Sequence, residues 1–296
     1  MTSIPVNRSS SLDPDGADAV MALARHAQEL DGVAPFNEAS RTALRDPGDA
    51  EHLHLGVLED GGLVGHLLAT RDADGWQGEL VVEPHHRRRG VGTALVGEYV
   101  LAAGADPVRV WAHGDLPGAA QLARHHGLEP VRTLLKLARP TDGPVSRPEE
   151  PAGTTTRTYV PGQDEQALLA VNARAFAHHP EQGRMDDRDL AQRTGSSWFD
   201  PAGLFLVEDA ADGRLLGFHW TKVEDGVGEV YVVGIDTGAQ GRGLGTYLTA
   251  VGLHHLTTEL GLPRVDLYVE GDNAPALAVY RGQGFVESSR DVLYRR

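Results

Sequence analysis

A glycine-rich turn occurs twice in the chain, each time between an apolar strand and an apolar helix. The first copy reads Arg-Arg-Arg-Gly-Val-Gly-Thr at residues 87–93, and the second reads Gln-Gly-Arg-Gly-Leu-Gly-Thr at residues 240–246. Glycines permit backbone angles and close approaches that a Cβ would block, and a helix that begins there offers unpaired N–H donors. Such a turn can hold a pyrophosphate. Two copies in one strand–turn–helix context predict phosphate cradles in a duplicated domain.

The turn differs from two other phosphate-binding motifs. A P-loop needs Gly-Lys-Ser/Thr, and a dinucleotide fingerprint needs three glycines with an acidic residue about 20 positions later. The pattern Gln/Arg-x-x-Gly-x-Gly instead resembles the pyrophosphate signature of the GNAT N-acetyltransferases. The resemblance implies acetyl-CoA as co-substrate, a splayed pair of strands and direct acyl transfer to an amine. The predicted fold class is α/β, with an α+β mixed sheet in each of two tandem GNAT domains.

Only the second half carries a candidate acid for this reaction. Residues 273–285 match the Asn-x-x-Ala-x-x-x-Tyr-x-x-x-Gly-Phe end of GNAT enzymes, whose tyrosine lies beside the CoA sulfur as proton donor. This resemblance implies that Tyr280 is the proton donor. The alternative is that Tyr280 is an aromatic residue of a helix with a packing role only. Alignment of Gly284 with Gly127 puts Ala123 where Tyr280 stands. The first half therefore keeps a cradle and lacks the acid.

A candidate base also occurs only in the second half. Glu229 opens the strand that leads to the second cradle, and Trp76 stands at the matching place in the first half. A carboxylate there could accept the amine proton directly or through water, although an ordinary solvated glutamate is the alternative. An α-amino group titrates near ~7.7–8.0, so a carboxylate suffices as its base. A tyrosine at ~10 beside a thiol at ~8.5 is expected to act mainly as a hydrogen-bond donor.

One stretch resembles a narrower family. Residues 172–183 read Asn-Ala-Arg-Ala-Phe-Ala-His-His-Pro-Glu-Gln-Gly and resemble the mycothiol synthases, actinobacterial enzymes with two fused GNAT domains. The resemblance covers nearly the whole chain. It implies acetyl transfer from acetyl-CoA to the cysteinyl amine of cysteinyl-glucosaminyl-inositol, the last step of mycothiol biosynthesis. Two alternatives stay open: a GNAT enzyme for another amine, such as a protein N-terminus or an aminoglycoside, and a non-catalytic module that senses acetyl-CoA.

The resemblance also implies the roles of individual residues. Catalysis falls to Glu229 and Tyr280. Substrate binding falls to Glu38, Glu181, Lys222, Glu229 and Tyr268, whose carboxylates and lysine can hold an ammonium group and sugar hydroxyls. Acetyl-CoA binding falls to the strand ends, the two cradles and one asparagine: Leu80, Val81, Val82, Arg88, Arg89, Gly90, Val91, Gly92, Thr93, Val233, Gly234, Ile235, Gln240, Gly241, Arg242, Gly243, Leu244, Gly245, Thr246 and Asn273.

Composition limits the classes of partner. The net charge of −15 argues against nonspecific nucleic-acid binding, and no apolar run is long enough to span a bilayer. The chain has no cysteine, which excludes disulfides and thiolate metal sites. Its 14 histidines include several adjacent pairs without a His-x-x-x-His spacing, so no metal is expected. With no signal peptide at the N-terminus, we expect a cytoplasmic monomer whose partner is a small pseudodisaccharide, with no nucleic acid and no membrane.

The expected organisation is two domains of similar order joined by a linker. Residues 1–139 form a CoA-binding and non-catalytic GNAT domain, residues 140–153 form a proline-rich linker, and residues 154–296 form the catalytic GNAT domain. Helices are expected over residues 16–30, 91–103, 118–126, 163–177, 245–260 and 274–283. Strands are expected over residues 53–58, 63–69, 79–82, 108–112, 155–159, 204–208, 215–222, 229–235 and 265–269.

Overall fold

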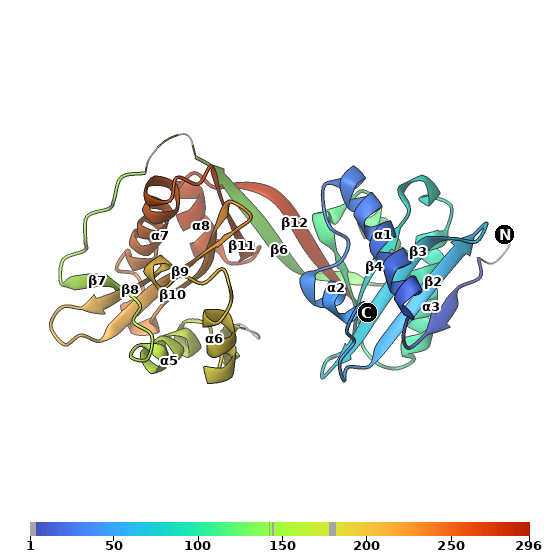
Figure 1. The fold of residues 1–296 in the computed structure, drawn as a ribbon, viewed down its shortest axis with the longest axis horizontal. Coiled ribbons are helices and arrows are strands. Elements are labelled where there is room, and N and C mark those ends of the chain that lie inside the picture. Colours follow the sequence, from blue (N-terminus) through green and yellow to red (C-terminus); the bar gives the residue numbers. More distant parts are fainter. Residues whose placement is uncertain (1–3, 142, 144, 178–181) are drawn as a thin grey trace. The chain divides into compact units, whose positions relative to one another are not determined.

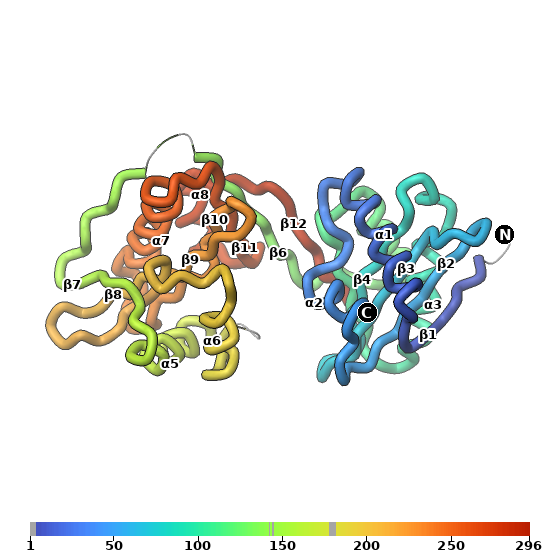
Figure 2. The backbone as a smooth tube through the Cα atoms, viewed as in Figure 1, coloured from blue at the N-terminus to red at the C-terminus, as the bar shows by residue number. Residues whose placement is uncertain are grey.

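The computed structural model describes residues 4–141, 143, 145–177 and 182–296. The chain divides into two compact units, Met1–Leu134 with Ser289–Arg296, and Leu135–Ser288. Each unit is a mixed sheet with helices on both faces (Figures 1 and 2). None of the helices in the described part of the chain is long and apolar enough to cross a membrane.

The N-terminal unit contains six paired strands in the order β1-β2-β3-β4-β5-β12. The strand pairs are antiparallel except for β4 and β5, which run parallel. Its elements are β1 (Asn7–Ser9), α1 (Pro14–Asp31), α2 (Glu38–Ala43), β2 (His52–Glu59), β3 (Gly62–Asp72), β4 (Gly75–Val82), α3 (Val91–Ala103), β5 (Val108–Ala112) and α4 (Ala119–His125).

Local sequence explains the long first helix and its orientation. Asp13 caps α1 by accepting a hydrogen bond from the backbone N–H of Gly16, and Gly32 ends it in the left-handed conformation. Val20 and Ala27 lie on its buried stripe, which packs on one face of the sheet. Helix α3 covers the opposite face, so the two helices sandwich β3 and β4.

The C-terminal unit repeats this arrangement with strands in the order β6-β11-β10-β9-β8-β7. Helices α5 and α6 cover one face of its sheet, and α7 and α8 cover the other (Figure 1). Its elements are β6 (Glu129–Pro140), β7 (Thr154–Thr158), α5 (Glu165–Ala175), α6 (Asp187–Thr194), β8 (Leu204–Asp209), β9 (Leu215–Glu224), β10 (Val227–Ile235), α7 (Leu244–His254), β11 (Arg264–Glu270), α8 (Ala274–Gly282) and β12 (Val286–Arg295).

The compact units differ from the predicted domain boundaries. The proline-rich segment was expected to join the domains, yet its Val145 bonds within the C-terminal unit, to Thr258 and His254. The chain instead passes between the units within β6 and again within β12, two strands that the sequence patterns did not predict. Proline content marks irregular backbone, which need not coincide with the place where contacts change.

The last strand of the chain completes the sheet of the N-terminal unit. In β12, Val292 lies opposite Ala112 of β5, and Tyr294 lies opposite Val110. Val292 and Tyr294 are buried in the same core as α3. The final eight residues are therefore structural parts of the first unit, although they follow the second unit in sequence.

A partly buried triad of ionisable residues holds this last strand in place. His113 lies between two carboxylates, with Nε2 at 2.8 Å from Glu79 Oε1 and Nδ1 at 3.0 Å from Asp291 Oδ2. Glu79 also accepts a hydrogen bond from the backbone N–H of Asn37, and Asp291 accepts one from that of Gly114. Burial lowers the pKa of His113, but the two carboxylates outweigh burial and raise it to about 9. The imidazolium form is thus held between β4 and β12.

We expect the triad to stabilise the N-terminal unit at low pH and to lose that effect in base. Because the folded-state pKa of His113 is raised from 6.5 to about 9, its contribution is complete below pH 6.5 and disappears as the pH rises through 9. The difference in unfolding free energy between wild type and His113→Gln should be about 3 kcal/mol at pH 6 and close to zero at pH 10. Urea denaturation at both pH values measures it, and a difference independent of pH would contradict the assignment.

Candidate active site

The two cradles share one backbone conformation despite their different residues. Gly90 and Gly243 begin α3 and α7 with φ of 94° and 77°, in the left-handed region where glycine has no steric penalty. Two positions earlier, Arg88 has φ of 62° and Gly241 has φ of 78°. The first cradle therefore keeps the same turn with an arginine in a strained position. Gly92 and Gly245, the last glycines of the two cradles, do not have a positive φ, and a Cβ on Gly245 would lie at an ordinary contact distance of 3.9 Å from Ile235.

An arginine–aspartate pair ties each cradle to the first helix of its unit. Arg87 donates to both carboxylate oxygens of Asp31 at the end of α1, at 2.8 and 2.6 Å. Arg174 of α5 donates to Asp236, which precedes the second cradle, at 2.8 and 2.6 Å. These pairs fix the loops before any ligand binds. Arg87 is thus a structural residue, and the cations that remain for a phosphate are those further along the cradles.

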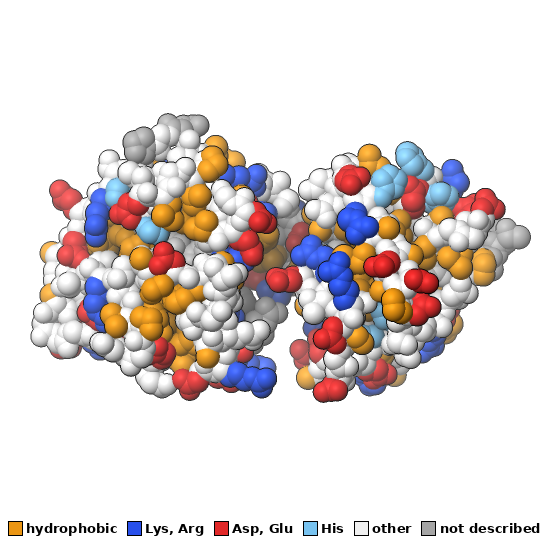
Figure 3. Space-filling model, viewed as in Figure 1, with side chains coloured by type: hydrophobic (Ala, Val, Ile, Leu, Met, Phe, Trp, Pro, Cys, Tyr) orange, Lys and Arg blue, Asp and Glu red, His pale blue; other side chains and the backbone are white. Residues whose placement is uncertain are grey.

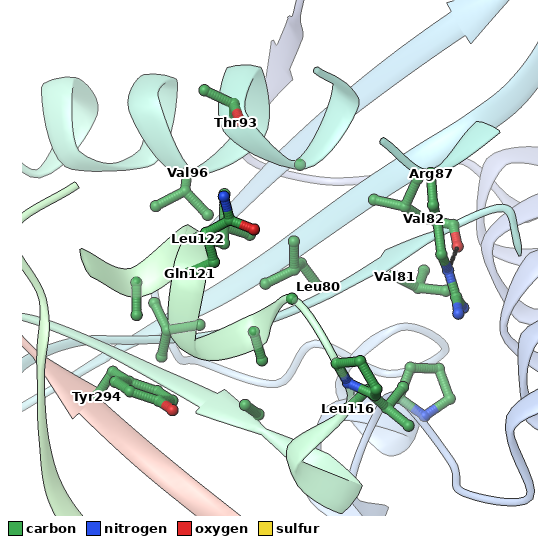
Figure 4. A pocket seen from close by; sticks show the side chains of 18 of the residues that line it. Leu80, Val81, Val82, Arg87, Thr93, Val96, Leu116, Gln121, Leu122 and Tyr294 are labelled. Carbon is green, nitrogen blue, oxygen red and sulfur yellow. Dashed lines mark hydrogen bonds between the residues drawn. The ribbon is translucent and has the colours of Figure 1, made fainter. Parts of the chain in front are cut away.

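A cavity of about 720 Å³ opens beside the first cradle (Figure 4). Seven of the nine first-half residues assigned to acetyl-CoA line it: Leu80, Val81, Val82, Arg88, Gly90, Gly92 and Thr93. The other two differ in exposure, since Arg89 is exposed and Val91 is buried in the core. Figure 4 shows that β4, α3 and α4 all contribute side chains to the wall, among them Leu80, Val96 and Leu122. The volume and the apolar wall suit a ligand with a long neutral arm and a phosphorylated end.

In the C-terminal unit, two parallel strands diverge in front of the second cradle. The β10–β11 ladder ends where Val230 lies opposite Leu267, although β10 continues to Ile235 and β11 to Glu270. A bulge in β10 at Tyr231 coincides with this point, because the register with β9 shifts between Val230 and Val232. An extra residue in one strand bends it away from its neighbour. The bulge therefore lies at the point where the two strands part.

The bulge changes the comparison between the two halves. Counted back from the cradle, Glu229 matches Trp76, as the sequence alignment predicted. Strand β4 pairs with β3 without a bulge, so it has one residue fewer than β10. By register with the next strand, Glu229 lies opposite Asp266, and its equivalent is Gln77, which lies opposite Arg109. The match to Trp76 is therefore wrong by one residue, and the first half has an amide where the second has a carboxylate.

Glu229 lies in the middle of a charged row. Its register neighbours are Asp266 on β11 and Lys222 on β9. Burial raises the pKa of Glu229, the cations of Lys222 and Lys136 lower it, and the anions of Asp266 and Glu224 raise it, with a net shift upward. A carboxyl whose pKa is raised toward neutrality is a stronger base than an ordinary glutamate.

The other predicted substrate residues have different surroundings. Lys222 forms an ion pair with Glu224 at 2.8 Å and lies over the ring of Trp198, 5.2 Å from its centroid. Tyr268 of β11 is 48% exposed, and the amine of Lys136 lies 5.4 Å from its ring centroid. Lys222, Glu229 and Tyr268 therefore belong to three neighbouring strands of one sheet.

Two of the predicted substrate-binding residues, Glu38 and Glu181, do not belong to these three strands. Glu38 belongs to the other unit, where it is exposed in the first turn of α2. Glu181 lies outside the described residues.

The predicted acid lies on the other face of the same unit. Tyr280 of α8 packs against the core that contains Val230 and Leu267, and its ring is 6.0 Å from that of Phe285. Burial raises the pKa of Tyr280 to about 12. At the start of the same helix, the Oδ1 of Asn273 accepts a hydrogen bond from the backbone of Ala276 at 3.2 Å, so this side chain also caps α8.

Sequence reasoning missed one carboxylate in this region. Asp266 is buried, accepts hydrogen bonds from Arg264 and lies 3.0 Å from the amine of Lys136. No motif marks Asp266. The available signal was the scarcity of lysine, since Lys136 and Lys222 are the only two in the chain and both lie in this row.

The histidines form one group with metal-ligating geometry within the described part of the chain. Ligand atoms of His26, Glu83 and His85 lie within 4.8 Å of one another. Glu83 is already bonded to His86 through its other oxygen, and both His26 and His85 are exposed. On the face shown in Figure 3, acidic and basic side chains are interspersed, so the net negative charge is not gathered into one patch there.

Comparison with known proteins agrees with this geometry. The sequence profile of the acetyltransferase (GNAT) family matches residues 19–128 and again residues 167–285. A mycothiol acetyltransferase from Thermomonospora curvata is 51% identical over 280 residues, which is 93% of this chain and 92% of that protein. A mycothiol acetyltransferase from Streptomyces coelicolor is 48% identical over 97% of this chain and 93% of that protein.

Solved structures show the same fold. A GCN5-related N-acetyltransferase from Sphaerobacter thermophilus superimposes with a TM-score of 0.73 at 25% identity, over 98% of this chain and 95% of that one. A tandem GNAT protein from the clavulanic acid biosynthesis pathway gives a TM-score of 0.72 at 21% identity, over 99% and 98% of the two chains. The predicted mixed α/β fold with two GNAT domains is confirmed. The chain is an acetyltransferase of the GNAT family, a tandem member that groups by sequence with the mycothiol acetyltransferases.

Proposed function

We propose that this enzyme transfers the acetyl group of acetyl-CoA to the cysteinyl amine of cysteinyl-glucosaminyl-inositol, the last step of mycothiol biosynthesis. The observation that carries the chemistry is Glu229, a half-buried carboxylate with a raised pKa beside the point where β10 and β11 diverge. The substrate follows from the relatives of nearly equal length that are named mycothiol acetyltransferases.

The proposed reaction runs through the gap between the diverging strands. The amine nitrogen attacks the thioester carbon, so that a C–N bond forms while the C–S bond breaks. Glu229 takes one proton from the ammonium, the second leaves the nitrogen as the amide forms, and the sulfur gains a proton. Glu229 and Tyr280 lie toward opposite faces of the sheet. This arrangement favours amine entry from the α5–α6 face and departure of sulfur toward α8.

The raised pKa of Tyr280 defines its part in the reaction. A phenol at about 12 is roughly 3.5 units above a thiol at ~8.5, so full proton transfer to the thiolate is uphill by roughly 5 kcal/mol. Tyr280 therefore acts chiefly by donating a hydrogen bond to the sulfur as negative charge develops there. A buried donor aimed at developing charge is most effective where water is excluded.

The polar residues around Glu229 suit a substrate that is rich in hydroxyl groups. In the proposal, Lys222 and Tyr268 bind the sugar or inositol hydroxyls, and Glu38 and Glu181 add carboxylate acceptors. Lys222 is a strong candidate, because the ion pair and the contact with Trp198 hold its amine in place.

We further propose that the N-terminal unit binds CoA without catalysing transfer. Its cradle has the same left-handed turns as the second one, and its cavity has room for the ligand. It has Gln77 in place of Glu229 and Ala123 in place of Tyr280, so it lacks both proton-transfer groups. The second site would use Val233, Gly234, Ile235 and residues 240–246 with Asn273. Acetyl-CoA is the only co-substrate in this proposal, and the enzyme is a cytoplasmic monomer without a metal.

Removal of either proton-transfer group should slow turnover without unfolding the protein. We expect Glu229→Gln and Tyr280→Phe each to lower kcat by up to ~10²–10⁴-fold. The loss should be larger for Glu229→Gln, because Tyr280 supplies only a hydrogen bond. Steady-state kinetics at saturating substrates, with circular dichroism as a folding control, measures this. Wild-type turnover in both variants would contradict the assigned roles.

A matched pair of substitutions separates the two cradles. A Cβ on Gly92 would lie 3.3 Å from Leu122 at the cavity wall, so Gly92→Glu should block the first cradle with both bulk and negative charge. We expect this variant to bind one CoA fewer and to retain appreciable acetylation. Gly245→Glu makes the same change in the second cradle and should abolish acetylation. Calorimetric stoichiometry and turnover read out the two effects, and complete inactivity of folded Gly92→Glu would show that the first site is essential.

The preference of the enzyme among different amines tests the proposed substrate. Acetyl-CoA is supplied with cysteinyl-glucosaminyl-inositol and, separately, with peptides, an aminoglycoside and free cysteine. We expect kcat/KM to be highest for the pseudodisaccharide, and Lys222→Ala to raise its KM more than that of acetyl-CoA. Preference for another amine would remove the mycothiol assignment and leave the acetyltransferase class intact. Acetyl-CoA binding without transfer to any amine would favour a sensing module.

A further inference from the structure

The two lysines of this chain lie at the two ends of a charged row that crosses four neighbouring strands. From β6 to β9 the row reads Lys136, Asp266, Glu229 and Lys222. Lys136 is 3.0 Å from Asp266, Asp266 is the register partner of Glu229, and Glu229 is the register partner of Lys222. The signs alternate as one cation, two anions and one cation.

All four side chains of the row share one face of the sheet. Side chains alternate between the faces along a strand, and the neighbours of the row residues lie in the core on the opposite face. Leu135 and Leu137 flank Lys136, Val265 and Leu267 flank Asp266, and Val230 follows Glu229, and all five belong to that core. Val223, the residue after Lys222, also packs against that core. The row is therefore a continuous polar strip on the α5–α6 side.

Asp266 and Glu229 place two carboxylates on adjacent strands, directly opposite each other. Like charges so placed repel and favour the protonated form of one partner. Asp266 is paired with Arg264 and Lys136, and its side chain is 8% exposed. Among the residues that the structure describes, Glu229 forms no ion pair within 4.0 Å, and its pKa responds to the charges of Lys222, Lys136, Asp266 and Glu224.

We infer that Lys136 and Asp266 are positioning residues that act on Glu229 from across β11 and set its basicity for amine deprotonation. Asp266 makes the glutamate a stronger base, and Lys136 limits this effect by neutralising Asp266. Lys136 also lies over the ring of Tyr268, so one cation fixes both a carboxylate and an aromatic of the site. The inference rests on the proposed function, because it concerns Glu229 as the base.

Other ionisable groups lie on the elements around Glu229. Lys222 and Glu224 of β9 act on its pKa, and Arg264 of β11 interacts with Asp266 and Tyr268 on its own strand. From the helical side, Arg193 of α6 lies over the ring of Tyr231, 5.7 Å from its centroid. None of these groups is substituted in the variants that test the inference, so their effect on the pKa of Glu229 is the same in each variant and in its control.

The test uses two substitutions with opposite expected effects. Lys136→Met removes a cation and should move the acid limb of the kcat/KM–pH profile to higher pH. Asp266→Asn removes an anion and should move the limb to lower pH. Each shift should be on the order of half to one pH unit, which is roughly a three- to tenfold rate change at fixed pH on the limb. The amine of the substrate also titrates in kcat/KM, but its pKa is the same in every variant.

Controls separate this effect from a general change of charge or structure. Arg188→Met and Glu149→Gln remove one exposed charge of each sign elsewhere in the C-terminal unit and should leave the limb in place. Lys136→Arg keeps the cation and should preserve the wild-type profile. The double variant Lys136→Met with Asp266→Asn should return the limb toward its wild-type position, because the two charges cancel. If Asp266→Asn fails to fold, the inference is still tested by whether Lys136→Met moves the acid limb to higher pH while Lys136→Arg leaves it in place.

The outcomes for the inference and for the proposed function are distinct. If wild type acetylates no amine, the proposed function fails before any profile is measured. If wild type is active and Glu229→Gln removes the limb, Glu229 is the base. In that case, limbs that do not move, or that move in the same direction in Lys136→Met and Asp266→Asn, would overturn the role of the Lys136–Asp266 pair.

Discussion

The divergence of β10 from β11 is the constraint on which the proposed chemistry depends. Parallel strands normally satisfy each other's backbone groups along their whole length, so an open stretch leaves N–H and C=O groups available to a ligand. The bulge at Tyr231 lies at this opening, two residues after Glu229. The same distortion exposes the backbone of β10 and places a carboxylate beside it. Base, ligand-binding strand and cradle then follow one another along a single segment of chain.

The duplication shows how one architecture can lose chemistry and keep binding geometry. The first cradle retains the left-handed turns of the second, even with Arg88 in place of a glycine. Strand β4 has no bulge, and Gln77 stands where Glu229 would be. The two halves therefore differ by one inserted residue in the strand before the cradle and by an amide in place of a carboxylate. The difference between the halves is local, although the folds match.

The end of the chain is a structural part of the N-terminal unit. Its sheet is completed by the last residues of β12, and the triad of Glu79, His113 and Asp291 fixes that strand. A buried ion triad is costly to break, because removing one member leaves uncompensated charge. The first and last segments of the sequence therefore belong to one core. The chain cannot be cut at the proline-rich segment without leaving a strand behind.

The sequence by itself determined the duplicated α/β order and the two cradles, because these depend on local periodicity and motif spacing. Glu229 and Tyr280 became the acid–base candidates through the resemblance of their surroundings to GNAT enzymes. The sequence alignment matched Trp76 to Glu229, because counting residues back from the cradle cannot detect a bulge in the strand. It also gave no sign that β12 pairs with β5 or that Asp266 lies beside Glu229. Those facts arise from strand pairing between segments distant in sequence, and such pairing is decided by the packing of the whole sheet. Tertiary structure alone therefore decided the charged row around the base.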